Sequence, residues 1–263
     1  VTGLELSHGR ARPLGQRDNR AWRECMLRED LTRRLKALAK GEGTTLYVTL
    51  LGAFEVLLYR YTGQEDILVG SPMLGRSRGV FGETVGDFVN VAVLRERLSG
   101  DTTFKALLSQ ARHTVLEAIA HHDHPFSLLV GQLPPTRDPS RAPLVQVLFV
   151  LQTFNLMTQL NERGISCENN TPGARKRLHL EPYVMPQAAG QFDLTVEISD
   201  TDGPLTGCFE YNADLFDATT IARMQEHFQV LLQGIVDQPN QLLADLPLMT
   251  PEERRQVVAW SGT

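Results

Sequence analysis

The stretch Thr45–Tyr61 constrains the fold more than any other part of the sequence. It carries apolar side chains nearly all the way around a helix, and Gly63 follows as a stop signal. A helix that is apolar on every side has to be covered on every side. The run is broken by Thr, Gly and Glu and is shorter than the roughly 20 apolar residues that a bilayer requires. We therefore expect this helix to lie buried against a sheet, and we expect no membrane span.

The size and charge of the chain exclude several classes of protein. Its 263 residues, 42% hydrophobic and 22% charged, suffice for one large domain or two small ones. With 26 Lys and Arg against 31 Asp and Glu, the net charge of -5 gives no footprint for nucleic acid or anionic lipid. Cys25, Cys167 and Cys208 are too sparse for a disulfide scaffold and lack zinc-site spacing, which favours a reduced, cytoplasmic setting. The start at Val1, without a signal peptide, suggests a piece of a longer polypeptide.

Hydrophobic periodicity predicts the order of the other elements. Apolar residues at helical spacing predict helices over 29–41, 103–120, 218–237 and 251–259, the second of them capped by Asp101 or Thr102. Alternating or continuous apolar runs predict strands over 23–27, 66–72, 88–98, 145–152, 191–199 and 205–211, the last two as a hairpin. The strand over 145–152 is apolar throughout, as a central strand covered on both faces would be. Residues 1–20 show no period and are predicted to be a linker or surface arm.

This order indicates an α/β (α+β) fold, with a mixed central sheet and helices packed on it. Residues 156–189 show no strong period and contain several glycines and prolines, which is typical of a long functional excursion.

Three histidines and a carboxylate, His121-His122-Asp123-His124, first suggest a metal site. Adjacent helical positions point about 100° apart, whereas helical zinc ligands are spaced i and i+4 so that they converge. A structural interpretation is favoured: Asp123 caps the turn before Pro125, and the histidines lie at a helix end whose partial negative charge suits them.

Two further motifs have weak catalytic interpretations. The Gly-rich segment 75–86 lacks both the phosphate-binding Gly-Lys-Ser ending and the dinucleotide spacing, so we interpret it as a mobile loop. Asp138, Ser140 and His124 could suggest a hydrolytic triad, but no serine sits in the strained elbow that exposes such a nucleophile. Arg137, Asp138 and Arg141 are better explained as a charged turn that pins a loop.

Three blocks in a fixed order carry a family resemblance. They are Val85-Gly86-Asp87-Phe88-Val89-Asn90 ending in Leu94-Arg95, then His121-His122-Asp123-His124-Pro125-Phe126, then Arg137-Asp138-Pro139-Ser140-Arg141-Ala142-Pro143-Leu144. Together they resemble the last three core motifs of the condensation domains of nonribosomal peptide synthetases. Supporting blocks are Tyr61–Asp66, Val69–Pro72, Gln191–Thr195, Glu210–Asn212 with Asp214–Phe216, Pro251–Glu253 and Trp260–Thr263, so the resemblance covers essentially the whole chain.

The resemblance implies a chloramphenicol acetyltransferase-like fold in which two lobes enclose a tunnel. Carrier proteins would dock at its two ends and present a thioester and an amine on phosphopantetheine arms. The family's His-His-x-x-x-Asp-Gly motif belongs to the first lobe. Counted from His121-His122, its Asp and Gly positions hold Phe126 and Ser127 here. The chain therefore resembles the second lobe alone: residues 1–22 as the inter-lobe connection, 23–245 as the C-terminal lobe, and 246–263 as the linker toward an adenylation domain.

The resemblance also implies roles for residues, with no catalytic residue, no metal ligand and no directly bound cofactor in this chain. The residues expected to line the tunnel are Asn90, Gln152, Thr153, Phe192 and Thr195. The floor loop is expected at about residues 75–90 and the latch within 156–189. Without a first lobe, we expect the floor loop and the latch to be mobile or misplaced. Residues expected to shape the motifs are Gly86, Phe88, Asn90, Arg95, His121, Asp123, Pro125, Phe126, Arg137, Asp138, Arg141, Pro143 and Asp193. Asp87, Val91, His122 and Ser127 depart from the family pattern, which weakens inferences about substrate but leaves the assignment of the lobe.

Several functions stay open at this stage. The leading one is the C-terminal half of an amide-forming enzyme, inactive as the isolated chain, whose partners are the first lobe, donor and acceptor carrier proteins and an adenylation domain. The alternative is a scaffold that docks a carrier protein or adenylation domain and takes no part in chemistry. A free-standing acyltransferase using coenzyme A is a third, disfavoured because no general base is evident. An isolated half is expected to expose an apolar surface, which self-association could cover.

Overall fold

The computed structural model describes residues 4–6, 12, 19–75, 83–133, 140–153, 192–201 and 203–261. In chain order their elements are β1 Arg20–Met26, α1 Glu29–Gly41, α2 Leu46–Thr62, β2 Asp66–Leu74, β3 Val89–Arg97, α3 Phe104–Ala120, α4 Phe126–Gln132, β4 Val147–Gln152, β5 Leu194–Ser199, β6 Thr206–Asn212, α6 Ala218–Asp237 and α7 Pro251–Ser261.

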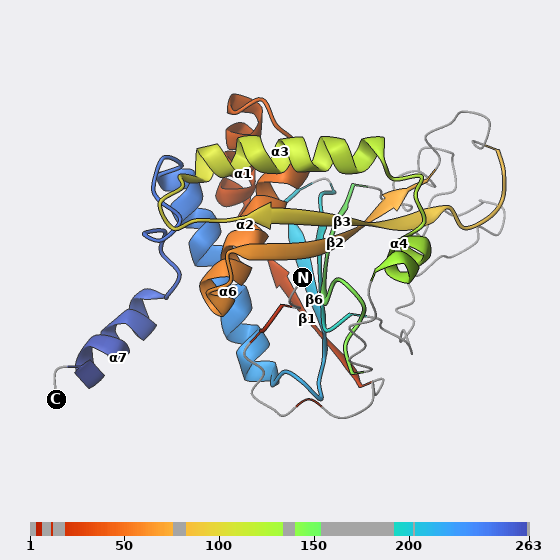
Figure 1. Cartoon of the computed structure of the whole chain (residues 1–263). Coiled ribbons are helices and arrows are strands. Elements are labelled where there is room, and N and C mark those ends of the chain that lie inside the picture. The colour runs from red at the N-terminus through yellow and green to blue at the C-terminus, as the bar shows by residue number, and fades with distance from the viewer. Residues whose placement is uncertain are drawn as a thin grey trace, which may run out of the picture.

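The strands form one six-stranded sheet in the order β1-β6-β5-β4-β2-β3 (Figure 1). β4 runs parallel to both of its neighbours, and the other pairs are antiparallel. The sheet is therefore mixed, as the sequence predicts, and the predicted hairpin is the antiparallel pair β5–β6.

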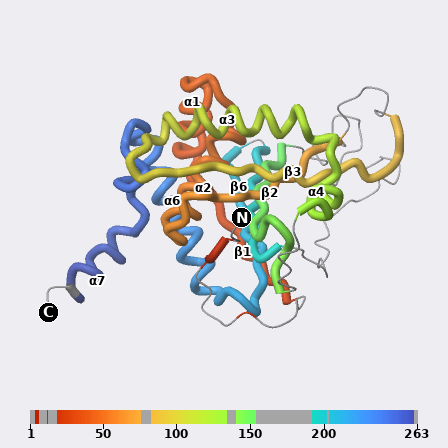
Figure 2. The backbone as a smooth tube through the Cα atoms, viewed as in Figure 1, coloured from red at the N-terminus to blue at the C-terminus, as the bar shows by residue number. Residues whose placement is uncertain are grey.

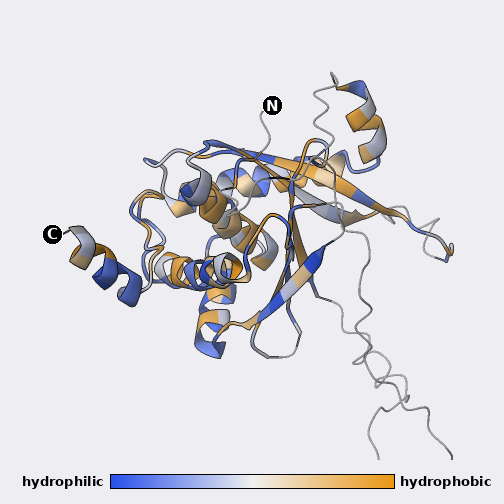
Figure 3. Ribbon diagram, turned by 90° about the horizontal axis from the view of Figure 1, so that it is seen from below, coloured by the Kyte–Doolittle hydropathy of each residue, from blue (hydrophilic) through white to orange (hydrophobic). Residues whose placement is uncertain are grey.

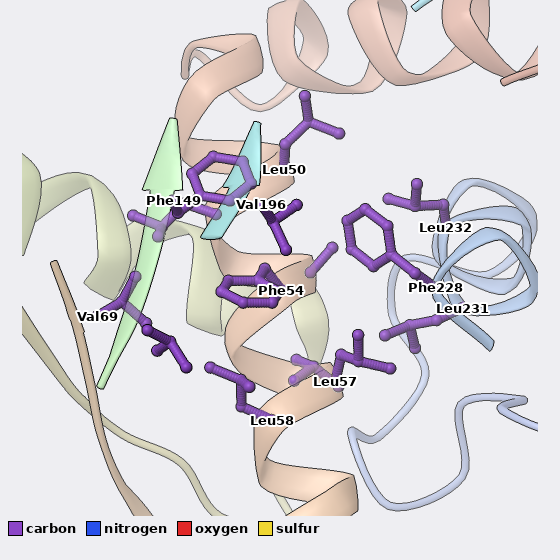
Figure 4. Close-up of a cluster of buried hydrophobic side chains, with 14 of the residues drawn as sticks. Leu50, Phe54, Leu57, Leu58, Val69, Phe149, Val196, Phe228, Leu231 and Leu232 are labelled. Carbon is purple, nitrogen blue, oxygen red and sulfur yellow. The ribbon is translucent and has the colours of Figure 1, made fainter. Parts of the chain in front are cut away.

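Helix α2 lies at the centre of the core. Its eleven residues from Val48 to Leu58 are all buried, including a glutamate, Glu55. Phe54 stacks on Phe149 of β4 at a centroid distance of 5.6 Å and meets Phe228 of α6 edge-on at 6.4 Å (Figure 4). Burying one such side chain stabilises the fold by about 1.5–3 kcal/mol. This cluster therefore fastens α2 and α6 to the sheet and explains why the Thr45–Tyr61 stretch is apolar all round.

Two local features differ from the predictions. Thr103, not Asp101 or Thr102, caps α3, and its hydroxyl accepts from the N–H of Ala106 at 3.3 Å. Residues 102 and 103 are instead tied to the C-terminal segment, through the Leu243 N–H to Thr102 O bond of 2.9 Å and a bridge between Thr103 and Leu242. Helix α4 was not predicted, because none of its seven residues is buried and no apolar stripe marks it.

The N-terminal arm is also held more closely than expected of a surface linker. Leu4 and Leu6 are each 4% exposed and belong to the main core cluster. Helix α7, by contrast, projects from the body toward the C-terminus (Figure 2). None of the described helices is both long enough and apolar enough to cross a membrane.

Candidate functional site

The long helices leave one face of the sheet without a helical cover (Figure 3). Strand alternation identifies that face: in β5, Leu194, Val196 and Ile198 are buried against the helices, so Thr195, Glu197 and Ser199 point the other way. The strand register extends this assignment into rows that cross neighbouring strands, because paired residues share a face. The three rows are Leu148–Thr195–Glu210–Trp22, Val150–Glu197–Cys208–Glu24 and Gln152–Ser199–Thr206–Met26. We call this the open face.

One half of the open face is apolar. It comprises side chains of β2, β3 and β4, which lie next to one another in the sheet. Gly70 leaves room for its neighbours, because a Cβ at this position would lie 2.9 Å from a methyl group of Leu148 and 3.1 Å from one of Val145 and would displace them. The residues of this apolar half are Leu68, Gly70, Pro72, Val91, Val93, Leu148 and Val150.

The other half, on β5, β6 and β1, is acidic. Glu24, Glu197 and Glu210 surround the thiol of Cys208, which occupies the middle of one row. Burial, followed by repulsion from these carboxylates, raises the pKa of Cys208 to about 11. Burial, with Glu210 nearby, also raises the pKa of Glu197. Because its thiol is disfavoured as a thiolate, Cys208 is a poor nucleophile at neutral pH.

A hollow of about 550 Å³ lies over the acidic half, at the Ser199 end. Besides Glu24, Glu197 and Cys208, it is lined by Ser199 and Thr206. Gln152 pairs with Ser199, so this predicted tunnel residue borders the hollow, and Thr195 lies two positions from Glu197 on the same face. Two of the predicted wall residues are thus brought onto one surface. Thr153 is exposed just beyond β4, and Phe192 is half-buried just before β5.

The N-terminal arm is fastened at the other end of the open face. Arg12 forms an ion pair with Asp193 and donates to the carbonyl oxygen of Ser140 at 2.8 Å. Gln146 accepts from the N–H of Leu4 at 2.8 Å and donates to the carbonyl oxygen of Ala142 at 3.0 Å. Asp193, predicted only as a structural motif residue, is therefore the anchor of the arm.

Asn90 points to the side of the sheet opposite the open face. Its carboxamide nitrogen donates to the carbonyl oxygens of His122 at 2.8 Å and His124 at 2.7 Å, and its oxygen accepts from the N–H of Phe126 at 3.0 Å. It pairs across the ladder with Met73, which packs on the core. Asn90 thus joins the first and second sequence blocks as a clamp, and the structure does not bring it together with Gln152 and Thr195.

The clustered histidines lie at a helix end, as expected. His121 is the C-cap of α3, and the ring of His122 contacts the carbonyl oxygen of Ile119 at 2.6 Å. The nearest Asp123 oxygen is 3.5 Å from the other nitrogen of His122. The described histidines occupy α3, the α3–α4 loop and α6, and none of them lies on a strand. Among the residues that the structure describes, no group of three or more His, Cys, Asp or Glu could hold a metal ion.

The remaining motif residues are placed as follows. Arg95 forms a bidentate ion pair with Asp66: its Nε and Nη2 donate to the two carboxylate oxygens at 2.8 and 2.6 Å. These bonds lower the pKa of Asp66. Arg141 lies 3.5 Å from Glu5, and Pro143 is exposed before Leu144, a leucine with φ 66°. Pro125 caps α4, which begins at Phe126. Arg137, Asp138 and the predicted latch within 156–189 lie outside the described residues.

The base of the predicted floor loop is partly described. The N–H of Gly75 donates to the carbonyl oxygen of Phe88 at 3.0 Å, and a Cβ at Gly75 would lie 2.2 Å from that oxygen. Three large apolar side chains around this base, Leu74, Val85 and Val89, are 79%, 100% and 53% exposed. Gly86 and Phe88 thus belong to an apolar projection from the sheet.

Sequence reasoning missed several polar residues that organise this region. Arg12 could not be found locally, because its partner Asp193 is 181 positions away. Gln146 stands out in hindsight as a polar residue at the start of a continuous apolar run. Glu55 could have been found as the carboxylate inside the all-apolar helix. It is 0% exposed beside Glu96, and burial followed by repulsion from Glu96 raises its pKa well above the ordinary value.

Comparison with known proteins identifies the family. Residues 6–258 match the model of the condensation domain. A linear gramicidin synthase protein of Brevibacillus parabrevis is 40% identical over 99% of this chain, but the chain spans 3% of that protein. A solved four-domain nonribosomal peptide synthetase, holo-AB3403 bound to AMP and glycine, superposes with a TM-score of 0.85 at 25% identity, covering 97% of this chain and 19% of the other.

A smaller solved structure shows what share of a condensation domain this chain corresponds to. The first condensation domain of the CDA synthetase superposes with a TM-score of 0.70 at 18% identity, and the match covers 90% of this chain and 50% of that one. The fold therefore corresponds to about half of that solved chain. From the sequence match over nearly its whole length, we conclude that the chain belongs to the condensation domain family.

Proposed function

We propose that this chain is the C-terminal half of a condensation domain, which joins carrier-bound acyl or aminoacyl thioesters through amide bonds. In this role it supplies the tunnel wall, floor loop and latch, and the first lobe supplies the proton-handling histidine. The observation that carries the proposal is the placement of histidine: the described imidazoles lie on helices or in the α3–α4 loop, and the strand residues that the structure places on the open face include none. A wall of this kind can position substrates, and the described residues of the open face supply no imidazole to take the proton of the attacking amine.

The apolar half of the open face supports the proposal that a first lobe packs on this side of the sheet. β4 is apolar on both of its faces, a pattern typical of strands that are covered twice, yet the described helices cover only one side. This chain superposes on 50% of the solved condensation domain, so the other half of that domain would correspond to a second body of similar size. A first lobe packed on this face would complete the cover and close the tunnel beside Gln152 and Thr195.

The arm and the C-terminal segment fit the same proposal. Residues 1–22 would be the connection from the first lobe, fixed at Asp193 by Arg12. Residues 246–263 would lead to an adenylation domain, and donor and acceptor carrier proteins would deliver their phosphopantetheine arms to the two tunnel mouths. The projection at Leu74, Val85 and Val89 would pass beneath the tunnel as part of the floor.

A docking scaffold is the competing function, because a lobe without a catalytic group could bind a carrier protein or an adenylation domain alone. The two functions differ in what occupies the open face. In the enzyme it packs on a first lobe, whereas in the scaffold it does not.

The test is a binding experiment with a separately produced first lobe that carries the His-His-x-x-x-Asp-Gly motif. Titration calorimetry should detect its association with this chain, and Val150→Asp, in the middle of the apolar half, should weaken it at least tenfold. Arg112→Asp, which places an aspartate on the exposed side of α3, should leave the affinity unchanged. Equal binding by wild type and Val150→Asp, or no binding at all, would refute the proposal.

A further inference from the structure

Helix α7 is largely exposed, and its first turn contacts the body of the protein. In Figure 1 it projects away from the sheet and the other helices. Of residues 251–260, Glu253 alone is half-buried, and the others are exposed. A helix of this length with so little burial gains little from packing. The environment of Glu253 therefore decides how α7 is connected to the rest.

The segment just before α7 is held firmly. Arg60 of α2 donates to the carbonyl oxygens of Leu243 at 3.1 Å and Leu246 at 2.8 Å. Leu246 is 1% exposed. Pro247 packs so closely on Gly234 of α6 that a Cβ there would lie 2.4 Å from the proline ring. The chain is thus fixed in place up to the start of α7.

A chain of hydrogen bonds then continues into the helix. Tyr61, on α2, is the first member of this chain. Tyr61 O–H lies 2.7 Å from Nδ1 of His227, and Nε2 of His227 lies 2.9 Å from a carboxylate oxygen of Glu253. Because the ionised Glu253 carboxylate can only accept, Nε2 of His227 donates to it, and Nδ1 accepts from the Tyr61 O–H. α2, α6 and α7 are therefore linked through one imidazole.

Glu253 also caps the N-terminus of its own helix. Thr250 and Glu253 form a complete capping box: the Thr250 hydroxyl accepts from the N–H of Glu253 at 3.2 Å, and the Glu253 carboxylate accepts from the N–H of Thr250 at 2.8 Å. Pro251 begins the helix, a position that suits proline. The capping box stabilises the helix itself, whereas the bond from His227 ties the helix to the body.

We propose that His227 and Glu253 form an orientation joint that fixes the direction in which α7 projects from the body of the protein. His227 and Tyr61 are positioning residues in this joint, and the capping box keeps α7 helical whether or not the joint is closed. The direction of α7 does not depend on the proposed function. Only its consequence does: an adenylation domain joined beyond α7 would be placed relative to the tunnel by this one imidazole.

The two tryptophans of the chain, Trp22 and Trp260, make a direct test possible. In a Trp22→Phe background, time-resolved fluorescence anisotropy reports the motion of Trp260, on α7. With the joint closed, Trp260 should tumble mainly with the whole protein. His227→Phe removes both ring nitrogens but keeps the capping box, and the amplitude of the nanosecond component should rise at least about twofold.

A second variant and a matched control keep the test decisive if His227→Phe folds poorly. Glu253→Gln retains a side chain that can form a capping box but weakens the bond from His227, so it should give a smaller rise. Glu252→Gln removes the same charge one position earlier, from an exposed residue paired with Arg255, and should match wild type. His227→Gln can still donate to Glu253 and should restore part of the rigidity.

Hydrogen exchange of residues 252–261 separates orientation from folding. The joint predicts that α7 keeps its amide protection in His227→Phe and Glu253→Gln while Trp260 becomes more mobile. Anisotropy in both variants equal to that of Glu252→Gln would overturn the proposal. So would increased mobility accompanied by loss of amide protection, because His227 would then be stabilising the helix and not directing it.

Discussion

The two faces of the sheet are built from the same strands but are completed in different ways. On the helix-covered face, side chains such as Phe149 and Val196 are fully buried by α2 and α6. On the open face, Val150 and Glu197 occupy the neighbouring positions and remain half-buried. The chain thus closes its own core on one side, and on the other it carries a surface whose apolar side chains Val93, Leu148 and Val150 stay only half-buried.

The largest expected effect contrasts adjacent residues of β4. Phe149→Ala, on the covered face, should destabilise the fold by about 3–5 kcal/mol, because the cavity would lie between α2 and the sheet. Val150→Ala, on the open face, should cost well under half of that. Urea denaturation of both variants measures the difference. Equal losses would show that the open face is packed in the free chain as tightly as the core.

A substitution at Asn90 tests whether this residue holds the α3–α4 loop, residues 121–126, on the helix-covered face of the sheet. Asn90→Ala leaves two carbonyl oxygens and one N–H without their present partner, at an expected cost of about 2–3 kcal/mol. Amide exchange in residues 121–126 should accelerate, while that of β5 and β6 should not. Unchanged exchange in the loop would mean that Asn90 does not hold it. Asn90→Asp keeps the acceptor for Phe126 but sets a carboxylate oxygen against the two carbonyl oxygens, so it should lose at least as much stability as Asn90→Ala.

Glu55 is the exception on the covered face. Its two carboxylate oxygens have no hydrogen-bond partner among the described residues, and burial raises its folded pKa while the unfolded chain keeps the ordinary value. Between those two values the folded state binds more protons, so the stability of the wild type falls as the pH rises above about 4. Glu55→Met should therefore stabilise the protein at pH 8 by about 1–3 kcal/mol, with the gain shrinking toward pH 4.

Thermal unfolding of Glu55→Met across this pH range checks the expectation. Glu226→Met makes the same change at an exposed position of α6 and should show no comparable pH dependence. A gain for Glu55→Met that is constant with pH would mean that Glu55 is already ionised in the folded protein.

The smallest effect on stability is expected on the acidic half of the open face. Glu197→Gln removes the carboxylate that, after burial, contributes most to raising the pKa of Cys208. The pH midpoint for alkylation of Cys208, followed site by site by mass spectrometry, should shift downward from about 11 while the melting temperature stays nearly constant. An unchanged midpoint would show that Glu197 does not influence the pKa of this thiol.

Local patterns predicted most of the fold. Hydrophobic periodicity and helix stop signals predicted α6 from Ala218 to Asp237, as observed, and predicted α2 to within one residue at each end. The prediction of the α3 cap was wrong because Asp101, Thr102 and Thr103 are all good capping residues. The choice among them is made by bonds to residues 239–243, far away in the sequence.

The candidate site was less accessible to sequence reasoning. Thr195 and Gln152 were placed by family resemblance, and they share the open face only because β4 and β5 pair in one particular register. Asn90 was assigned both a wall and a structural role, and its clamp function depends on contacts 32 to 36 residues away. Such long-range pairings are set by topology and leave no periodic signal in the sequence.

The most direct test of the account is a product assay with carrier-bound substrates. This chain, a first lobe bearing the His-His-x-x-x-Asp-Gly motif, and two loaded carrier proteins are combined, and dipeptidyl thioester is followed by mass. Product is expected only when both lobes are present, and it should disappear when the second histidine of the first lobe's motif is replaced by alanine. Dipeptidyl thioester formed by this chain and the carriers alone would contradict the division of labour proposed here.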